Sequence, residues 1–121
     1  MAQTDEGYML TELWNAKPSW LALSEEERRA FFEKKMHPFV ASLVGQGAEL
    51  LGCAINDNTG TERIGYRYMA VWKLPDKAFS DRLEAGAKEL GFLDYFDQAN
   101  CSGSIITGAA MDEDMIDLKP Q

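Results

Sequence analysis

The sequence has one histidine, two cysteines and no apolar run long enough to cross a membrane. The single histidine, His37, excludes a metal site built from several imidazoles. Cys53 and Cys101 lack the C-x-x-C spacing of zinc and redox motifs, so we expect two buried free thiols and no metal. No basic start is followed by an apolar stretch, so we see no secretory signal and expect a cytoplasmic protein.

Basic residues are also few, with 12 Lys and Arg against 20 Asp and Glu, a net charge of −8. This balance disfavours nucleic acid and anionic membrane surfaces as partners. The 121 residues are 45% hydrophobic and 26% charged, which is typical of one globular domain. We expect that domain to span residues 1–121, with loose residues 1–7 and an acidic tail over 109–121.

Four strands are predicted from β-forming and apolar runs bounded by turn-forming residues, at 8–15, 48–55, 66–74 and 103–107. The second and third strands are expected to form a hairpin. The acidic tail carries apolar residues at Met111, Met115, Ile116 and Leu118, which we expect to contact a partner.

Two helices are predicted between these strands. The first begins after Ser24, which forms a capping box with Glu27, and runs to Gly45 with a kink near His37 caused by Pro38. The second follows Pro75-Asp76 and ends before Gly91, and a short helical turn is expected within 92–100.

The resulting order, β-α-β-β-α-β, predicts a ferredoxin-like α+β fold, a four-stranded antiparallel sheet with both helices on one face. Neither sheet face looks polar enough for solvent, because the first two strands are apolar on both sides. We therefore expect a two-fold homodimer that buries the free sheet faces.

Four stretches of the chain are the basis of a family resemblance: KPSWLALSEEERRAFFEK (17–34), AELLG (48–52), YRYMAVWKLP (66–75) and GFLDYFDQAN (91–100). Over about residues 8–108 the chain resembles the dimeric α+β barrel superfamily, and within it a family of small uncharacterised bacterial proteins. That superfamily includes cofactor-free monooxygenases acting on polycyclic phenols, lactone isomerases, haem-using enzymes and proteins with no known activity. The resemblance therefore implies a pocket and not a reaction.

Glu12 and His37 are the candidate catalytic residues. Glu12 lies in an apolar strand, where a buried and unpaired carboxyl would have a raised pKa suited to proton transfer. The alternative is a structural ion pair of Glu12 with Arg67 or Lys73. His37 is a candidate base or haem ligand, and the alternative is a helix-kink histidine that is hydrogen-bonded locally or exposed before Pro38.

The candidate ligand-binding residues form two groups. An aromatic wall is expected from Trp14, Tyr66, Tyr68 and Trp72, and polar groups at a cavity mouth from Tyr95, Asp97 and Asn100. The alternatives are that the aromatics only pack in the core or dimer, and that Asp97 and Asn100 cap a turn.

These residues leave two classes of function open. In the first, each subunit binds a small apolar or aromatic molecule and turns it over without a bound cofactor, like a monooxygenase or isomerase. In the second, the protein is a non-enzymatic dimeric binding or assembly module. Haem binding through His37 is a third and weaker alternative.

Overall fold

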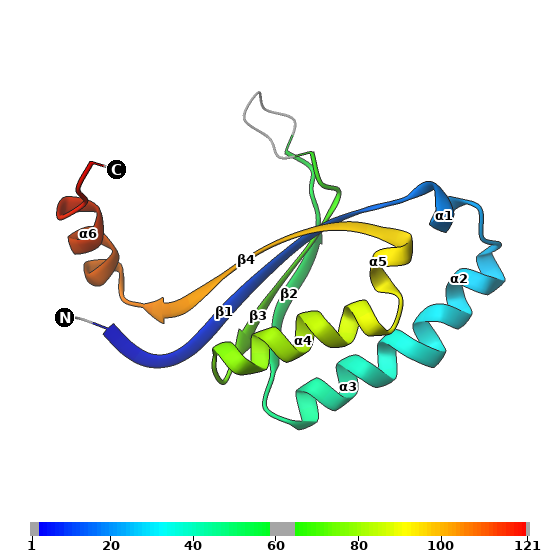
Figure 1. Cartoon of the computed structure of the whole chain (residues 1–121), viewed down its shortest axis with the longest axis horizontal. Helices are drawn as coiled ribbons and strands as arrows, with labels where there is room; N and C mark the ends of the chain where they lie inside the picture. The colour runs from blue at the N-terminus through cyan, green and yellow to red at the C-terminus, as the bar shows by residue number, and fades with distance from the viewer. Residues whose placement is uncertain (1–2, 59–64, 121) are drawn as a thin grey trace.

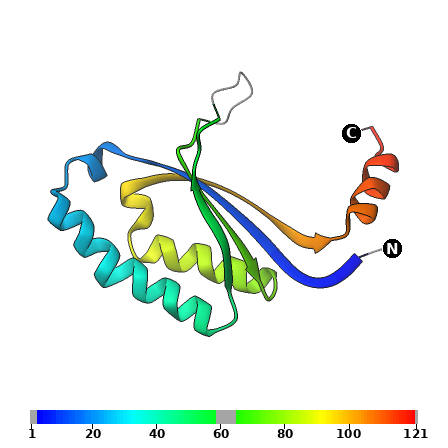
Figure 2. The ribbon, with the colours of Figure 1, turned by 180° about the vertical axis from the view of Figure 1, so that it is seen from behind.

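The structure is a computed structural model that describes residues 3–58 and 65–120 (Figures 1 and 2). Its elements are, in chain order, β1 (Gln3–Ala16), α1 (Pro18–Leu21), α2 (Glu25–Phe31), the π-helical turn η1 (Phe32–Met36), α3 (His37–Gly45), β2 (Glu49–Ile55), β3 (Tyr68–Leu74), α4 (Lys77–Glu89), α5 (Phe92–Tyr95), β4 (Phe96–Ile106) and α6 (Gly108–Ile116). No helix among these described residues is long and apolar enough to span a bilayer.

The four strands form one antiparallel sheet in the order β2-β3-β1-β4. Helices α2, α3 and α4 lie together on one side of this sheet (Figure 1). This is the predicted ferredoxin-like α+β arrangement, including the hairpin of β2 with β3.

Side chains along the central strands β1 and β3 point alternately to the two faces of the sheet, and those on one face contact the helices. In β1, Leu10 and Glu12 are buried, and in the paired β3 Trp72 and Leu74 are buried. The main core cluster under the helices consists of Leu10, Leu43, Ala48, Trp72, Leu74, Phe79 and Leu83. A second cluster at the other end of the helical layer consists of Trp20, Phe31, Ala87, Phe92 and Phe96.

The long first helix changes its winding where a kink was predicted. Ser24 caps α2 through the expected capping box with Glu27, at 3.1 and 2.9 Å. Before Pro38 the chain makes the π-helical turn η1, in which the His37 N–H donates to the carbonyl of Phe32. Proline has no N–H and crowds the preceding turn, and the wider turn accommodates it without breaking the helix.

Several element boundaries and two burial predictions were wrong. β1 begins at Gln3 rather than Tyr8, and β3 begins at Tyr68 rather than Tyr66. Cys53 and Cys101 are exposed free thiols, because the first lies on the edge strand β2 and the second on the sheet face away from the helices.

The segment 92–100 is only partly the helical turn that was predicted. It forms the short helix α5 over Phe92–Tyr95 and then continues as β4. Asp97 and Asn100 therefore lie in a strand paired with β1, not in a capped turn, since β-pairing over many residues outweighs local side-chain capping.

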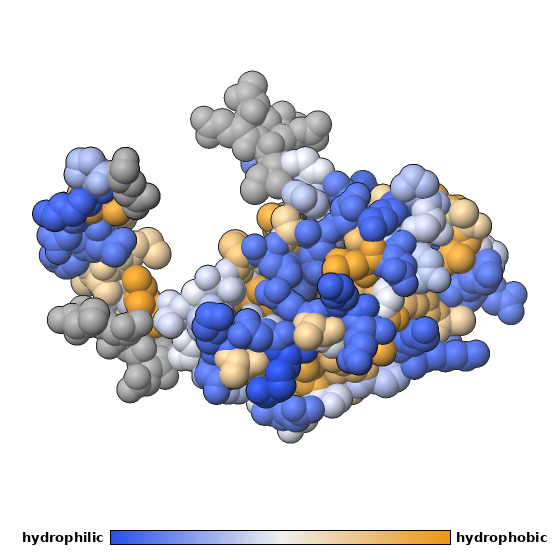
Figure 3. Space-filling view, viewed as in Figure 1, coloured by the Kyte–Doolittle hydropathy of each residue, from blue (hydrophilic) through white to orange (hydrophobic). Residues whose placement is uncertain are grey.

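The C-terminal tail forms a helix, α6, that stands apart from the body of the domain beyond the end of β4 (Figures 1 and 3). It lies on the side of the sheet opposite α3 and α4. Its large apolar side chains are exposed: Met111, Met115, Ile116 and, just after the helix, Leu118.

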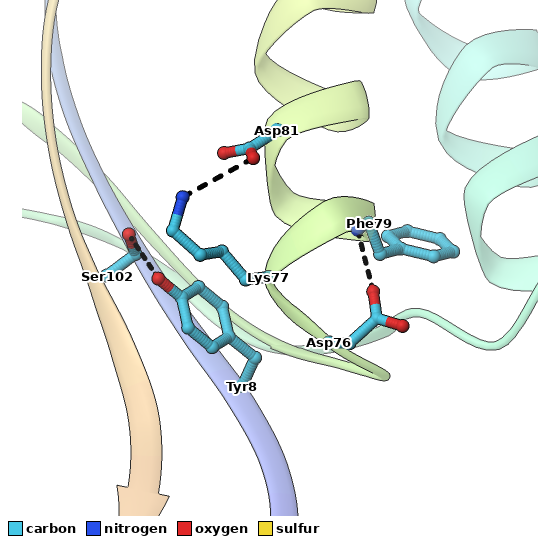
Figure 4. A network of polar contacts seen from close by, with 6 residues as sticks. All are labelled: Tyr8, Asp76, Lys77, Phe79, Asp81 and Ser102. Carbon is cyan, nitrogen blue, oxygen red and sulfur yellow. Dashed lines mark hydrogen bonds and ion pairs between the residues drawn. The ribbon is translucent and has the colours of Figure 1, made fainter.

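Local polar contacts lie around β1 and at the start of α4 (Figure 4). Asp76 caps α4 by accepting from the Phe79 N–H at 2.8 Å. The hydroxyls of Tyr8 and Ser102 are 3.3 Å apart and link β1 to β4. An exposed ion pair of Lys77 with Asp81 contributes little to stability.

Gly86 allows α3 and α4 to approach closely. A Cβ built there would lie 2.6 and 2.7 Å from two ring atoms of Phe39. At Gly45, the last residue of α3, a Cβ would meet nothing within 4 Å. Gly86, inside α4, thus faces a packed ring, whereas Gly45, at the end of α3, faces open space.

We predict opposite effects of alanine at these two glycines. Gly86→Ala should lower the free energy of unfolding by about 1–3 kcal/mol, because the methyl group displaces the Phe39 ring. Gly45→Ala should raise it by up to about 1 kcal/mol, since alanine has the higher helix propensity. Urea unfolding of both variants measures this. Equal stabilisation by both would contradict the close packing of α3 on α4.

Candidate functional site

A cavity of about 550 Å³ lies between the sheet and the helices. Its walls are mainly aromatic and aliphatic side chains from β1, β2, β3, η1, α3, α4 and α5: Trp14, Phe32, Met36, Phe39, Val40, Ala41, Leu43, Leu50, Ala70, Trp72, Leu83, Ala87 and Phe92. Glu12, His37, Cys53 and Gln98 complete the lining. Its size and mostly apolar walls with few polar groups are typical of a small-molecule site.

The exposed lining residues indicate where this cavity opens. His37 and Ala41 of α3 and Leu50 and Cys53 of β2 are all exposed, whereas the residues from β1 and β3 are largely buried. The mouth therefore lies between α3 and the edge strand β2. The interior end is formed by the central strands.

Glu12 lies at this interior end and is only 8% exposed. Its Oε1 accepts from the indole N–H of Trp72 at 2.8 Å, and its Oε2 accepts from the side-chain amide of Gln98 at 2.9 Å. The alternative, an ion pair of Glu12 with Arg67 or Lys73, is absent from the contacts of the described residues. Lys73 is paired with Met9 across the sheet, on the opposite face from Glu12.

The surroundings of Glu12 raise the pKa of its carboxyl above the ordinary glutamate value. Burial is the largest cause, because it penalises the charged form. The hydrogen bonds from Trp72 and Gln98 favour the carboxylate and offset part of that increase, and the negative charge of Glu84 adds to it. Glu12 therefore combines a fixed position with an increased proton affinity.

His37 lies on the opposite wall, at the end of the π-helical turn. Its ring stacks on Phe32, with centroids 6.0 Å apart. The turn thus directs two of its residues, Phe32 and Met36, and the following His37 to the cavity. Glu12 on the sheet and His37 at the mouth are the two predicted catalytic residues, and both line one cavity.

The predicted aromatic wall is only partly present. Trp14 and Trp72 line the cavity. Tyr68 lies behind Trp14, with ring centroids 5.9 Å apart, and Tyr66 precedes β3. Neither tyrosine is among the lining residues.

The three residues expected at the mouth lie elsewhere. Tyr95 packs in the aromatic cluster, 5.5 Å from Trp20 and 5.2 Å from Phe31 between centroids. Asp97 is exposed and pairs with Asn15, while Asn100 is exposed opposite Glu12. None of the three lines the cavity.

Gln98 is the functional candidate that the sequence analysis missed. It lies between Asp97 and Asn100 in a segment expected to be a turn. Had residues 96–100 been interpreted as a strand, the two-residue period from buried Phe96 would have placed Gln98 on the helix-facing side.

No group of three or more His, Cys, Asp and Glu side chains is arranged to hold a metal ion within the described ranges 3–58 and 65–120.

We predict that Glu12→Gln changes how stability depends on pH. A carboxyl with a raised pKa binds more protons folded than unfolded, so ionisation costs stability as the pH rises from the ordinary glutamate value through the folded value. Glutamine does not titrate, and with Gln98 rotated it keeps both hydrogen bonds. The free energy of unfolding of the variant minus that of the wild type should therefore increase from about pH 4 to about pH 8.

Urea unfolding at several pH values measures this difference, with Glu26→Gln on the exposed surface of α2 as the control. A difference that is constant or decreases with pH would contradict the raised pKa of Glu12.

The fold resembles solved structures at low sequence identity. The crystal structure of a "Putative Chlorite dismutase" matches with a TM-score of 0.64 and 12% identity, over 85% of this chain and 45% of that one. The solution structure of a hypothetical Arabidopsis thaliana protein matches with a TM-score of 0.55 and 13% identity, over 88% and 95%. These likenesses show the fold alone, and this chain spans less than half of the first protein.

No curated protein matches the sequence. The model of a family of unknown function, DUF6616, matches residues 7–118. This match confirms the predicted resemblance to an uncharacterised family, and the solved structures share the α+β fold of this chain. The chain therefore belongs to the family of unknown function DUF6616.

Proposed function

We propose that this protein binds a small, largely apolar molecule in the cavity between its sheet and helices, with Glu12 positioned to exchange a proton with it. The observation that carries this proposal is the buried Glu12 carboxyl at the interior end of an apolar cavity of about 550 Å³. A carboxyl in such surroundings is suited to general acid-base work because its raised pKa brings proton affinity closer to neutral pH.

Each of four predicted site residues has a part in this proposal. Trp14 and Trp72 offer flat apolar surfaces to the ligand. Glu12 is the acid or base, and His37 at the mouth is the second proton carrier, on the opposite wall. A reaction that needs only proton transfer and positioning, such as an isomerisation or a cofactor-independent oxygenation, is compatible with these groups.

Haem does not fit the same cavity well. His37 is exposed and stacked on Phe32, and no lysine or arginine of the described chain lines the cavity to hold the two propionates. The carboxyl of Glu12 would instead oppose them. We therefore derive no step through haem.

Ligand binding is tested by closing the mouth. Ala41→Trp on exposed α3 should place an indole in the cavity and weaken binding of the neutral fluorescent probe N-phenylnaphthylamine by about tenfold or more. Ser42→Trp, on the adjacent exposed residue outside the lining, should leave binding unchanged. Fluorescence titration compares them, and native mass spectrometry of the wild type shows any ligand carried through purification. Absence of probe binding to the wild type would overturn the proposal.

We further propose that the protein is a homodimer through the sheet face that the helices leave uncovered. The register supports this, because Met9, Leu13, Met69 and Val71 share that face and are partly or largely exposed. Two sheets that stack on such faces bury their apolar side chains in a layer about 10 Å thick. Helix α6 lies on the same side of the sheet, so we include its exposed apolar residues in the contact with the second copy.

A charge on this face should separate the subunits. Val71→Glu is expected to give the monomer mass by size-exclusion chromatography with light scattering, because the contact would bury an unpaired carboxylate of each subunit in an apolar layer. Ala85→Glu, exposed on α4, should remain dimeric. Removing residues 110–121 should weaken the dimer. A wild-type protein with monomer mass would contradict the sheet-face dimer.

A further inference from the structure

The charged groups at the interior end of the cavity are acidic. Glu12 lines its interior end, and the charge of Glu84 on α4 acts on that carboxyl. The titratable groups from the other walls are His37 on α3 and Cys53 on β2, both at the exposed mouth. No lysine or arginine of residues 3–58 and 65–120 contributes to the lining.

The hydrogen-bonding capacity of Glu12 also favours a ligand that carries a donor over an anionic ligand. Each carboxylate oxygen accepts one N–H, from Trp72 or from Gln98, and keeps one lone pair free. An ionised carboxylate is an acceptor only, so these free sites require a donor from whatever fills the cavity. A ligand carboxylate offers no donor and would bring a second negative charge into an apolar enclosure.

The aromatic walls are compatible with a neutral or a positively charged donor. Trp14 and Phe92 are in edge contact, with centroids 6.0 Å apart, and Trp72 is fixed by its bond to Glu12. Ring faces attract cations and tolerate neutral groups. The indole N–H of Trp72 is already engaged by Glu12, so it does not serve an anion.

We propose that the natural ligand is an apolar molecule that carries a hydroxyl or amine donor and no anionic group, and that this donor binds the carboxylate of Glu12. This inference rests on the proposed binding function. It makes Glu12 the residue that selects the chemical class of the ligand, in addition to its role in proton exchange.

The test uses three probes with the same aromatic body: naphthylmethanol, naphthylmethylamine and naphthoate. Isothermal titration calorimetry at about pH 8 should show the alcohol and the amine binding at least about tenfold more tightly than the carboxylate, since like-charge juxtaposition is strongly unfavourable. In Glu12→Gln, which has no charge, the disadvantage of naphthoate should shrink to within about threefold of the alcohol. Glu26→Gln, on α2 and outside the cavity lining, should keep the wild-type order.

The outcomes distinguish the proposed selection of the ligand by Glu12 from the proposed binding of a ligand in the cavity. Tight binding of naphthoate by the wild type, or a disadvantage of naphthoate in Glu12→Gln that is as large as in the wild type, overturns the selection by Glu12 while ligand binding itself stands. Binding of none of the three probes to the wild type overturns both the inference and the proposed function.

Discussion

The carboxyl of Glu12 joins three of the four strands at one buried point. It lies on β1 and accepts hydrogen bonds from Trp72 on β3 and Gln98 on β4. A buried carboxyl without such partners would cost several kcal/mol, so the positions of these two side chains are tied to it. The same two hydrogen bonds hold the carboxyl where the cavity begins, so the geometry of the candidate site depends on them.

The cavity exists because the helical layer does not close over the β2 side of the sheet. The Phe39 ring of α3 packs against Gly86 of α4, whereas the residues of edge strand β2 are all exposed. Pro38 widens the preceding turn and leaves Phe32, Met36 and His37 facing the open space. A proline effect on one helix thus contributes directly to the candidate site.

Much of the fold follows from local patterns, and the site follows only in part. The capping box at Ser24, the change of helix winding before Pro38 and the alternation in β3 are predictable from the sequence because each is a local effect. Glu12 and His37 were found from their residue types in apolar elements. Gln98 was missed, and Tyr95, Asp97 and Asn100 lie outside the cavity, because β4 begins earlier than its polar residues indicate and is stabilised by its long pairing with β1.

The central claim is that Glu12 is a buried carboxyl with increased proton affinity that faces the cavity. Its side-chain carboxyl carbon, followed by NMR during a pH titration of ¹³C-labelled protein and assigned with Glu12→Gln, tests this directly. The account predicts a midpoint clearly above the ordinary glutamate value and a shift of that midpoint when naphthylmethanol is added. A midpoint at or below the ordinary value, unchanged by the ligand, would contradict it.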